Sequence, residues 1–322
     1  MEKQKENGLQ IYLVDGSQAV YLNEAFEELT IFLAGAASNG VNENSDMARV
    51  VGEIYAYNPT HKMRCLLSYH YYKKADLSKL LTSSAYPKPI IMADSGAFSA
   101  ETLGVPIDIN EYADWLKHWD NYIDVYANLD VIGNPAKTLE NQRILEDKGL
   151  NPFPVFHVNE SWDYLEYYLE NYDYIALGGL VPHAMHLERL MPWLIKAFKM
   201  LPEGKGYHGF GVTGWEVLKS FPWRSVDSTS WSSSYRFGRI PLFSPVEGKF
   251  VTAFLSNRAS CYQYRDLFKY AGYDWEDFAN WKKREPITGG MRKKLCGISA
   301  ISFLRAEDWL RKRHSRTGVM YG

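Results

Sequence analysis

Residues 152–200, PFPVFHVNESWDYLEYYLENYDYIALGGLVPHAMHLERLMPWLIKAFKM, decide the fold of this chain. A short apolar run at 152–158 precedes a helix-patterned stretch at 161–171, and the same order repeats at 174–180 and 187–200. Strands that alternate with helical segments of this length are typical of βαβ units and of a parallel sheet. The strands of such a sheet read as continuous apolar runs because helices cover both of its faces.

Outward from this stretch, the same alternation continues in both directions. The expected strands are 29–37, 64–72, 89–95, 122–131, 152–158, 174–180, 206–212 and 224–227. The expected helices are 110–119, 135–148, 161–171, 187–200 and 213–220. Eight strand-then-helix units predict the α/β class and a (β/α)₈ TIM barrel. An open doubly wound sheet is the alternative, but no Gly-x-Gly-x-x-Gly fingerprint follows an early strand.

Composition sets the class of protein. The 322 residues are 46% hydrophobic and 23% charged, which excludes a disordered chain, collagen and a coiled coil. The apolar runs are too short to span a membrane. Three distant cysteines without metal-ligand spacing favour a reducing cytoplasm over a disulfide framework. We therefore expect a cytoplasmic protein with a catalytic barrel over residues 1–250 and a mostly helical, basic extension over residues 251–322.

Positive charge gathers at the C-terminus. Residues 282–322 hold 11 Lys and Arg against 3 Asp and Glu, a net charge of +8; since the whole chain carries −2, the preceding residues carry −10. A solvated terminal helix would explain this, and so would a phosphate-binding face. Trp223 and Trp231 interleave with arginines near the last strand, a pattern typical of surfaces that bind unstacked nucleic acid. The candidate nucleic-acid contacts are Arg224, Arg236, Arg239, Lys293, Lys294, Arg311, Lys312 and Arg313.

Polar residues end several of the expected strands. In a barrel these carboxyl ends share one rim, where active sites are found. Asp94, Asp130 and Asp227 fall on this rim, together with His157 and a Gly-Gly turn. A lone aspartate at a strand end is often only a helix cap, and His157 could be a buried histidine bonded to the backbone. Three aspartates with a histidine favour a catalytic cluster.

Paired carboxylates without metal-ligand spacing indicate chemistry at an acetal-like carbon. One carboxylate attacks the anomeric centre while the other exchanges a proton with the leaving group. This chemistry covers both glycoside hydrolysis and the exchange of a base on a nucleoside. Phe98 and Phe210, at rim positions, could hold a planar ring between them. We expect no cofactor and no metal; His183 and His186 have the i, i+3 spacing of a metal pair, but Pro182 precedes them and contact with substrate is the better interpretation.

Five motifs in order resemble those of the tRNA-guanine transglycosylases, which make queuosine and archaeosine. The motifs are Asp94-Ser95-Gly96-Ala97-Phe98, Asn128-Leu129-Asp130, Gly178-Gly179-Leu180, Phe210-Gly211-Val212 and Ser225-Val226-Asp227. The resemblance runs from about Asp94 to Trp231 and loosely covers the whole barrel. It implies that Asp227 is the nucleophile and that Asp94 acts in acid/base chemistry.

The resemblance also implies a pocket for the base. In it, Asp130 would read the guanine edge, a glycine N–H would meet the base carbonyl, and the two phenylalanines would enclose the ring. His157 stands where the family has a glutamine. The base-binding residues implied in this way are Asp130, His157, Gly178, Gly179, Phe98, Phe210 and Ser95.

One departure from the family bears on the substrate. The tRNA enzymes carry a Cys-x-Cys-x-x-Cys…His zinc site after the nucleophile, whereas only isolated Cys261 and Cys296 follow it here, so that site cannot form. A zinc-less relative resembles the DNA-directed branch of phages and bacteria, which inserts 7-deazaguanines of the preQ0 type. We therefore expect a pentosyltransferase that exchanges guanine in DNA for a 7-deazaguanine, in the host cytoplasm if a phage encodes it. The alternatives are the same exchange on tRNA, a retaining glycoside or nucleoside hydrolase, and an inactive nucleic-acid-binding subunit.

Overall fold

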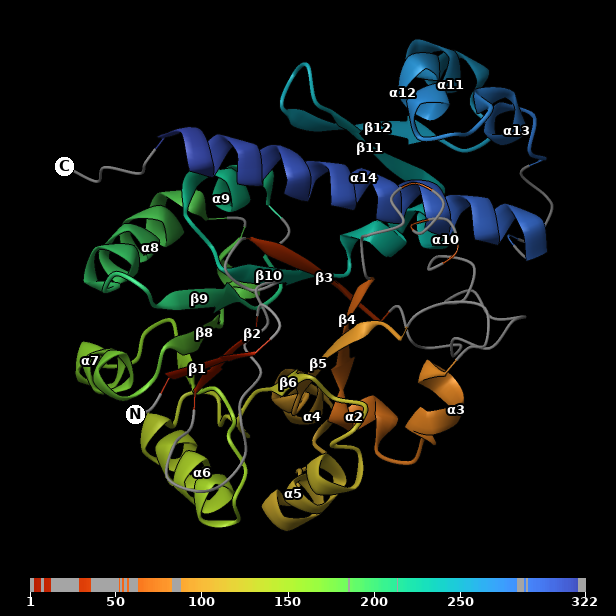
Figure 1. The fold of residues 1–322 in the computed structure, drawn as a ribbon. Helices are drawn as coiled ribbons and strands as arrows, with labels where there is room; N and C mark the ends of the chain where they lie inside the picture. The colour runs from red at the N-terminus through yellow and green to blue at the C-terminus, as the bar shows by residue number, and fades with distance from the viewer. Residues whose placement is uncertain are drawn as a thin grey trace.

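Eight parallel strands form one curled sheet with helices around it (Figure 1). The computed structural model describes residues 3–6, 9–12, 29–35, 52, 54, 57, 63–82, 88–184, 186–212, 214–282, 287 and 289–317, with the backbone alone for 3–6, 9–12 and 314–317. The strands are β3 (Thr30–Ala34), β4 (Arg64–Ser68), β5 (Ile90–Asp94), β6 (Val125–Tyr126), β7 (Val155–His157), β8 (Tyr174–Gly178), β9 (Gly206–Gly209) and β10 (Ser225–Ser228). All eight predicted strands are present, and the α/β class is confirmed.

Within the sheet, the last of the eight strands along the chain pairs with the first of them. The strand order reads β6-β5-β4-β3-β10-β9-β8-β7, with β10 in register beside β3. At the two ends of this order, an isolated parallel bridge links Ala127, just after β6, to Phe153, just before β7. The N–H of Phe153 donates to the carbonyl of Tyr126, and the N–H of Asn128 donates to the carbonyl of Phe153, each at 3.0 Å.

Helices follow the strands in sequence and cover the outside of the sheet (Figure 1). They are α2 (Tyr69–Tyr72), α3 (Leu77–Leu81), α4 (Ala97–Leu103), α5 (Ile109–His118), α6 (Pro135–Asp147), α7 (Trp162–Asn171), α8 (Leu187–Met200) and α9 (Trp215–Ser220). Local sequence fixes where some of them begin. The carboxylate of Asp108 accepts two N–H groups at the start of α5, and Pro135 occupies the first turn of α6, where its missing N–H is not needed.

Alternate residues of each strand enter two separate cores. One set lines the inside of the curled sheet, where Phe32, Met92, Phe153 and Tyr174 belong to a single buried cluster. The intervening residues, such as Ile91, pack outward against the helices in a second cluster. This division follows from the period-2 geometry of a strand, and it fixes which polar residues at the strand ends point inside.

The serine, glycine, tryptophan and arginine residues of 228–250 predict a long loop after the last strand, and this prediction is wrong: the segment after β10 forms short helices and a hairpin. The elements are η4 (Ser230–Ser232), α10 (Ser233–Phe237), β11 (Arg239–Ser244), β12 (Lys249–Phe254), α11 (Arg258–Gln263), α12 (Arg265–Tyr270) and α13 (Trp275–Ala279). Pro241 lies in β11, which a two-stranded sheet tolerates because the far side of each strand is an edge. A domain boundary at residue 250 would fall inside β12.

The helix α14 (Gly289–Thr317) runs along the curled sheet and beneath the hairpin (Figure 1). Phe303 and Leu304 pack into the cluster outside the sheet, while Leu295 and Ile298 join a third cluster with the hairpin and α11–α13. The predicted helical extension thus packs on the sheet. A further antiparallel hairpin pairs β1 (Lys3–Glu6) with β2 (Leu9–Tyr12). In the described residues, no helix has the length and apolar character needed to cross a bilayer.

Candidate active site

Polar side chains continue the inner set of strand residues at the carboxyl ends of the strands. Ile90 and Met92 of β5 lie in the inner cluster, so Asp94, two residues further, faces the same side. The same alternation places His157 of β7 and Asp227 of β10 inside. Five of the predicted residues converge at the carboxyl ends of the strands: Asp94, Asp130, His157, Gly178 and Asp227, of which Asp130 lies in the loop after β6.

Asp94 lies in an environment that disfavours its charge. The pKa of Asp94 is raised to about 8, mainly by burial. The Ser68 hydroxyl is the largest opposing influence, the carboxylates of Asp227 and Asp130 add to the rise, and the N–H of Gly96 lowers the pKa slightly. Its Oδ1 is buried and makes no hydrogen bond to the described residues. Asp94 is therefore a carboxylic acid near neutral pH, which suits a group that gives and takes a proton.

Asp227 is buried in a different environment, one of hydrogen-bond donors. The backbone N–H of Gly211 donates to its Oδ1 at 2.7 Å, and Nε2 of His208 lies 3.4 Å from the same oxygen. Nδ1 of His208 is 2.6 Å from the hydroxyl of Ser225, which also contacts the hydroxyl of Tyr174. The Gly211 N–H holds the carboxylate in place at the end of β10, with the imidazole of His208 beside it.

Asp130 and His157 form a charged cluster with Glu160. Nε2 of His157 is 2.9 Å from Asp130 Oδ2, and Nδ1 is 3.1 Å from Glu160 Oε1. Burial lowers the pKa of His157, but hydrogen bonds and charge interactions with Asp130 and Glu160 outweigh it and raise the pKa to about 10. The hydroxyl of Ser95 donates to Asp130 Oδ1 at 3.0 Å. Ser95, Asp130 and His157, all predicted to bind the base, thus contact one another.

The predicted Gly-Gly turn lies directly beside this cluster. A Cβ on Gly178 would lie 2.6 Å from Cδ2 of His157, so the imidazole occupies the space that any other residue would fill. Gly179 has φ +71°, a conformation that disfavours other residues. The first glycine therefore makes room for His157, and the second shapes the turn after β8.

The two predicted stacking phenylalanines lie in different surroundings. Phe210 is half-buried against the inner cluster, with its ring centroid 4.7 Å from that of His208 and 6.4 Å from that of Phe153. Phe98 lies in the first turn of α4 after Asp94 and is 59% exposed. Phe210 thus covers the inner core beside Asp227, and Phe98 leaves an aromatic face open to solvent.

The predicted nucleic-acid contacts do not share one surface. Arg224 precedes β10 and donates to the carbonyl of Gly204, so it lies at the amino ends of the strands, away from Asp227. Arg311 donates to the carbonyl of Leu29 and pairs with Glu307 at 2.8 Å. Lys294 pairs with Asp277, and Lys293 is half-buried. The exposed cations of the set are Arg236, Arg239, Lys312 and Arg313.

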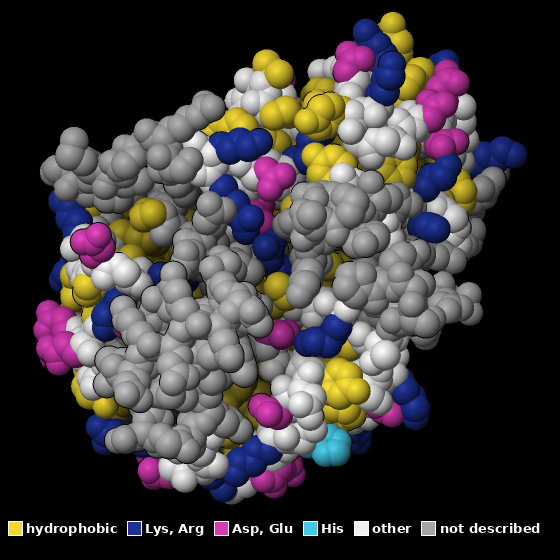
Figure 2. Space-filling view, viewed as in Figure 1, with side chains coloured by type: hydrophobic (Ala, Val, Ile, Leu, Met, Phe, Trp, Pro, Cys, Tyr) yellow, Lys and Arg dark blue, Asp and Glu magenta, His cyan; other side chains and the backbone are white. Residues whose placement is uncertain are grey.

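Trp223 and Trp231 are core residues, so the prediction that they contact nucleic acid is wrong. Each is 2% exposed, and their indole N–H groups donate to the carbonyls of Val217 and Ala34. On the part of the surface coloured in Figure 2, Lys and Arg side chains alternate with Asp and Glu instead of forming one basic patch.

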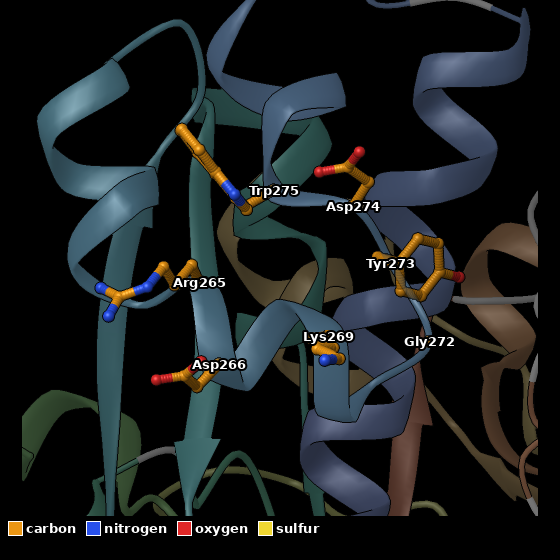
Figure 3. Close-up of a pocket in the computed structure, with 7 residues that line it drawn as sticks. All are labelled: Arg265, Asp266, Lys269, Gly272, Tyr273, Asp274 and Trp275. Carbon is orange, nitrogen blue, oxygen red and sulfur yellow. The ribbon is translucent and has the colours of Figure 1, made fainter.

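A surface pocket of about 530 Å³ lies in the extension, on α12 and α13 and apart from the carboxylates (Figure 3). Its charged lining residues are Arg265, Lys269, Asp266 and Asp274, whose charges balance. The described residues contain no group of three His, Cys, Asp or Glu side chains suited to a metal ion. Neither feature adds a reactive group to the carboxylate site.

Several residues of the site were not predicted from the sequence. Glu160 was missed, although the His-x-x-Glu spacing with Asn159 between could have indicated a turn that brings the two side chains together. Ser225 and Tyr174 were missed because nothing local distinguishes them from strand residues. No protein-family model matches this chain, and no curated protein is significantly similar to it.

Proposed function

We propose that the curled sheet closes into a (β/α)₈ barrel and that the chain is a base-exchange transglycosylase. It would replace guanine in DNA by a 7-deazaguanine of the preQ0 type. The bridge between Ala127 and Phe153, which lies between β6 and β7 at the two ends of the strand order, supports closure. The position of the carboxylates at the carboxyl ends of the strands agrees with the place where barrel enzymes act.

The observation that carries the proposal is the contrast between Asp94 and Asp227. The two carboxyl groups interact electrostatically, yet burial keeps a proton on one while a backbone N–H and a histidine surround the other. Two carboxyl groups whose environments differ in this way are the usual basis for assigning an acid and a nucleophile. The contrast suits substitution at a glycosidic carbon.

In this mechanism, Asp227 attacks C1′ of the target nucleotide and the C1′–N9 bond breaks. Asp94 gives its proton to the leaving guanine, which departs as the neutral base. A 7-deazaguanine then enters, Asp94 takes its N9 proton, and N9 displaces Asp227 from C1′. Two displacements at C1′ retain the β configuration. The target nucleotide has to leave its stack, at a cost of a few kcal/mol, so single-stranded or distorted DNA is the better substrate.

Three substrates test the proposal together. The protein is incubated with guanine-containing DNA, with tRNA and with a labelled 7-deazaguanine, and incorporation and covalent adducts are measured. Label in DNA supports the proposal, label in tRNA alone replaces DNA by tRNA, and free base with abasic product indicates a hydrolase. Asp227→Ala should abolish both label and adduct, while Asp266→Ala, an exposed aspartate of the extension, should retain both.

A further inference from the structure

The contacts between Glu160 and His157 have no role in the proposed mechanism. Both ring nitrogens of His157 face carboxylate oxygens, Asp130 on one side and Glu160 on the other. Ionised carboxylates only accept hydrogen bonds, so both contacts are made when both nitrogens carry a proton. The geometry therefore favours the imidazolium form, in agreement with the raised pKa of His157, about 10.

The turn after β7 fixes Glu160 in this position. Its Oε2 accepts the backbone N–H of His157 at 3.0 Å while its Oε1 faces the ring, so one carboxylate holds both parts of the same residue. Asn159 has φ +74°, a conformation that asparagine tolerates better than most residues. His157 and Glu160 are both buried, so solvent does not compete for these contacts.

The contacts within the cluster determine which hydrogen-bond acceptor sites of Asp130 are already used. Among the described residues, Oδ1 accepts from Ser95 and Oδ2 faces His157, so each oxygen can accept one further hydrogen bond. Two parallel acceptors match two parallel N–H donors, as on the N1–H and 2-amino edge of guanine. His157, with both of its N–H groups engaged, is not available to the base in this arrangement.

We propose that Glu160 and His157 are positioning residues that hold Asp130 in the orientation needed to accept two N–H groups from a guanine-type base. This inference rests on the proposed function and names how its base pocket selects the base. Titratable groups that face the cluster are Asp94 from β5, Tyr112 from α5 and Tyr168 from α7. Burial keeps Asp94 protonated near neutral pH and raises the pKa of both tyrosines.

The charge state is tested first, without any substrate. Ring ¹⁵N shifts of histidine-labelled protein are followed by NMR against pH in the wild type, Glu160→Gln and Glu166→Gln, an exposed control on α7. We expect His157 to stay doubly protonated to about pH 10 in the wild type and the control, and to lose its proton at least about one pH unit lower in Glu160→Gln. An unchanged titration in Glu160→Gln would overturn the proposed role of Glu160.

Base selection is tested next, with guanine against hypoxanthine, which lacks the 2-amino group. In Glu160→Gln we expect KM for guanine to rise about tenfold with kcat nearly unchanged, and the preference over hypoxanthine to fall. Glu160→Asp, which keeps the charge, should restore part of the preference and guards against a folding defect in the amide variant. A shifted titration with an unchanged preference would overturn the recognition role. If the wild type neither binds nor exchanges guanine, the proposed function fails, and NMR still decides the charge of His157.

Discussion

Buried carboxyl groups lie at both ends of the curled sheet, and their hydrogen-bond and ion-pair partners differ between the two ends. At the amino ends, Glu307 of α14 accepts the N–H of Ile31 at 2.7 Å and pairs with Arg64 at 2.7 Å and Arg311 at 2.8 Å. At the carboxyl ends, Asp94 keeps a buried oxygen without a hydrogen bond to the described residues. In the first arrangement, cations of the protein surround the carboxylate, whereas the second has a carboxyl group left to act on something else.

The difference separates structural from functional charge. A buried carboxylate surrounded by matched donors fastens elements together: here Glu307 ties the helix to β3 and β4. A buried carboxyl with a raised pKa lowers stability in the ionised form and persists where chemistry needs a proton donor. Substitutions at the two ends should therefore affect different properties.

The largest expected effect is the loss of activity in Asp94→Asn. The amide cannot give or take the proton, and general acid–base catalysis contributes about 10²–10⁴-fold, so exchange should slow by that factor. Incorporation of labelled 7-deazaguanine into DNA measures it. Activity within about tenfold of the wild type would show that Asp94 is not the acid, and the functional role assigned to the carboxyl ends would fail.

The stability of the Asp94→Asn variant should increase relative to that of the wild type as the pH rises. The folded pKa of Asp94, about 8, lies above its ordinary value of 3.8, so the stability that the protonated group contributes is complete below about pH 4 and is lost as the pH rises through 8. Asparagine has no proton to lose. Thermal unfolding should therefore show Tm of the variant gaining on the wild type over this interval, and a widening deficit would contradict the assignment.

The next effect is a loss of stability in Glu307→Ala with the chemistry intact. Removing one partner of a buried ion pair leaves Arg64 uncompensated and costs about 3–5 kcal/mol of unfolding free energy. Denaturant unfolding measures the loss. The control is Glu276→Ala, whose pair with Arg258 is exposed and contributes at most about 1 kcal/mol. If Glu307→Ala lowered kcat at full stability, the amino-end charge would be functional after all.

The smallest effect concerns the exposed end of α14. Lys312→Glu/Arg313→Glu should weaken DNA binding and reduce the slope of log K against log[salt] by roughly 0.7 for each lost phosphate contact on single strands. Arg311→Glu should instead destabilise the fold, because Arg311 bonds to Leu29 and Glu307. Competition at about 0.1 M salt compares DNA with tRNA of equal length; displacement of DNA by substoichiometric tRNA would favour the tRNA alternative.

The alternation of apolar and helical segments determined the strands, and the period of two determined which strand-end residues face inside. Asp94, His157 and Asp227 could therefore be selected from the sequence, since each ends a buried strand. The hairpin of β11 and β12 could not, because Pro241 and the flanking serine and glycine residues resemble a loop and only pairing between the two segments makes them strands.

Tertiary structure alone decided the partners of the charged residues. Arg224 is three residues from Asp227, but a strand rises about 3.3 Å per residue, which puts it at the other end of β10. Arg311 belongs to a basic run in the sequence, yet packing of α14 against β3 directs its side chain to a carbonyl and a carboxylate. Residue type and spacing determined which groups could react. Which of them are paired and which keep an unmatched charge depended on contacts between segments far apart in the chain.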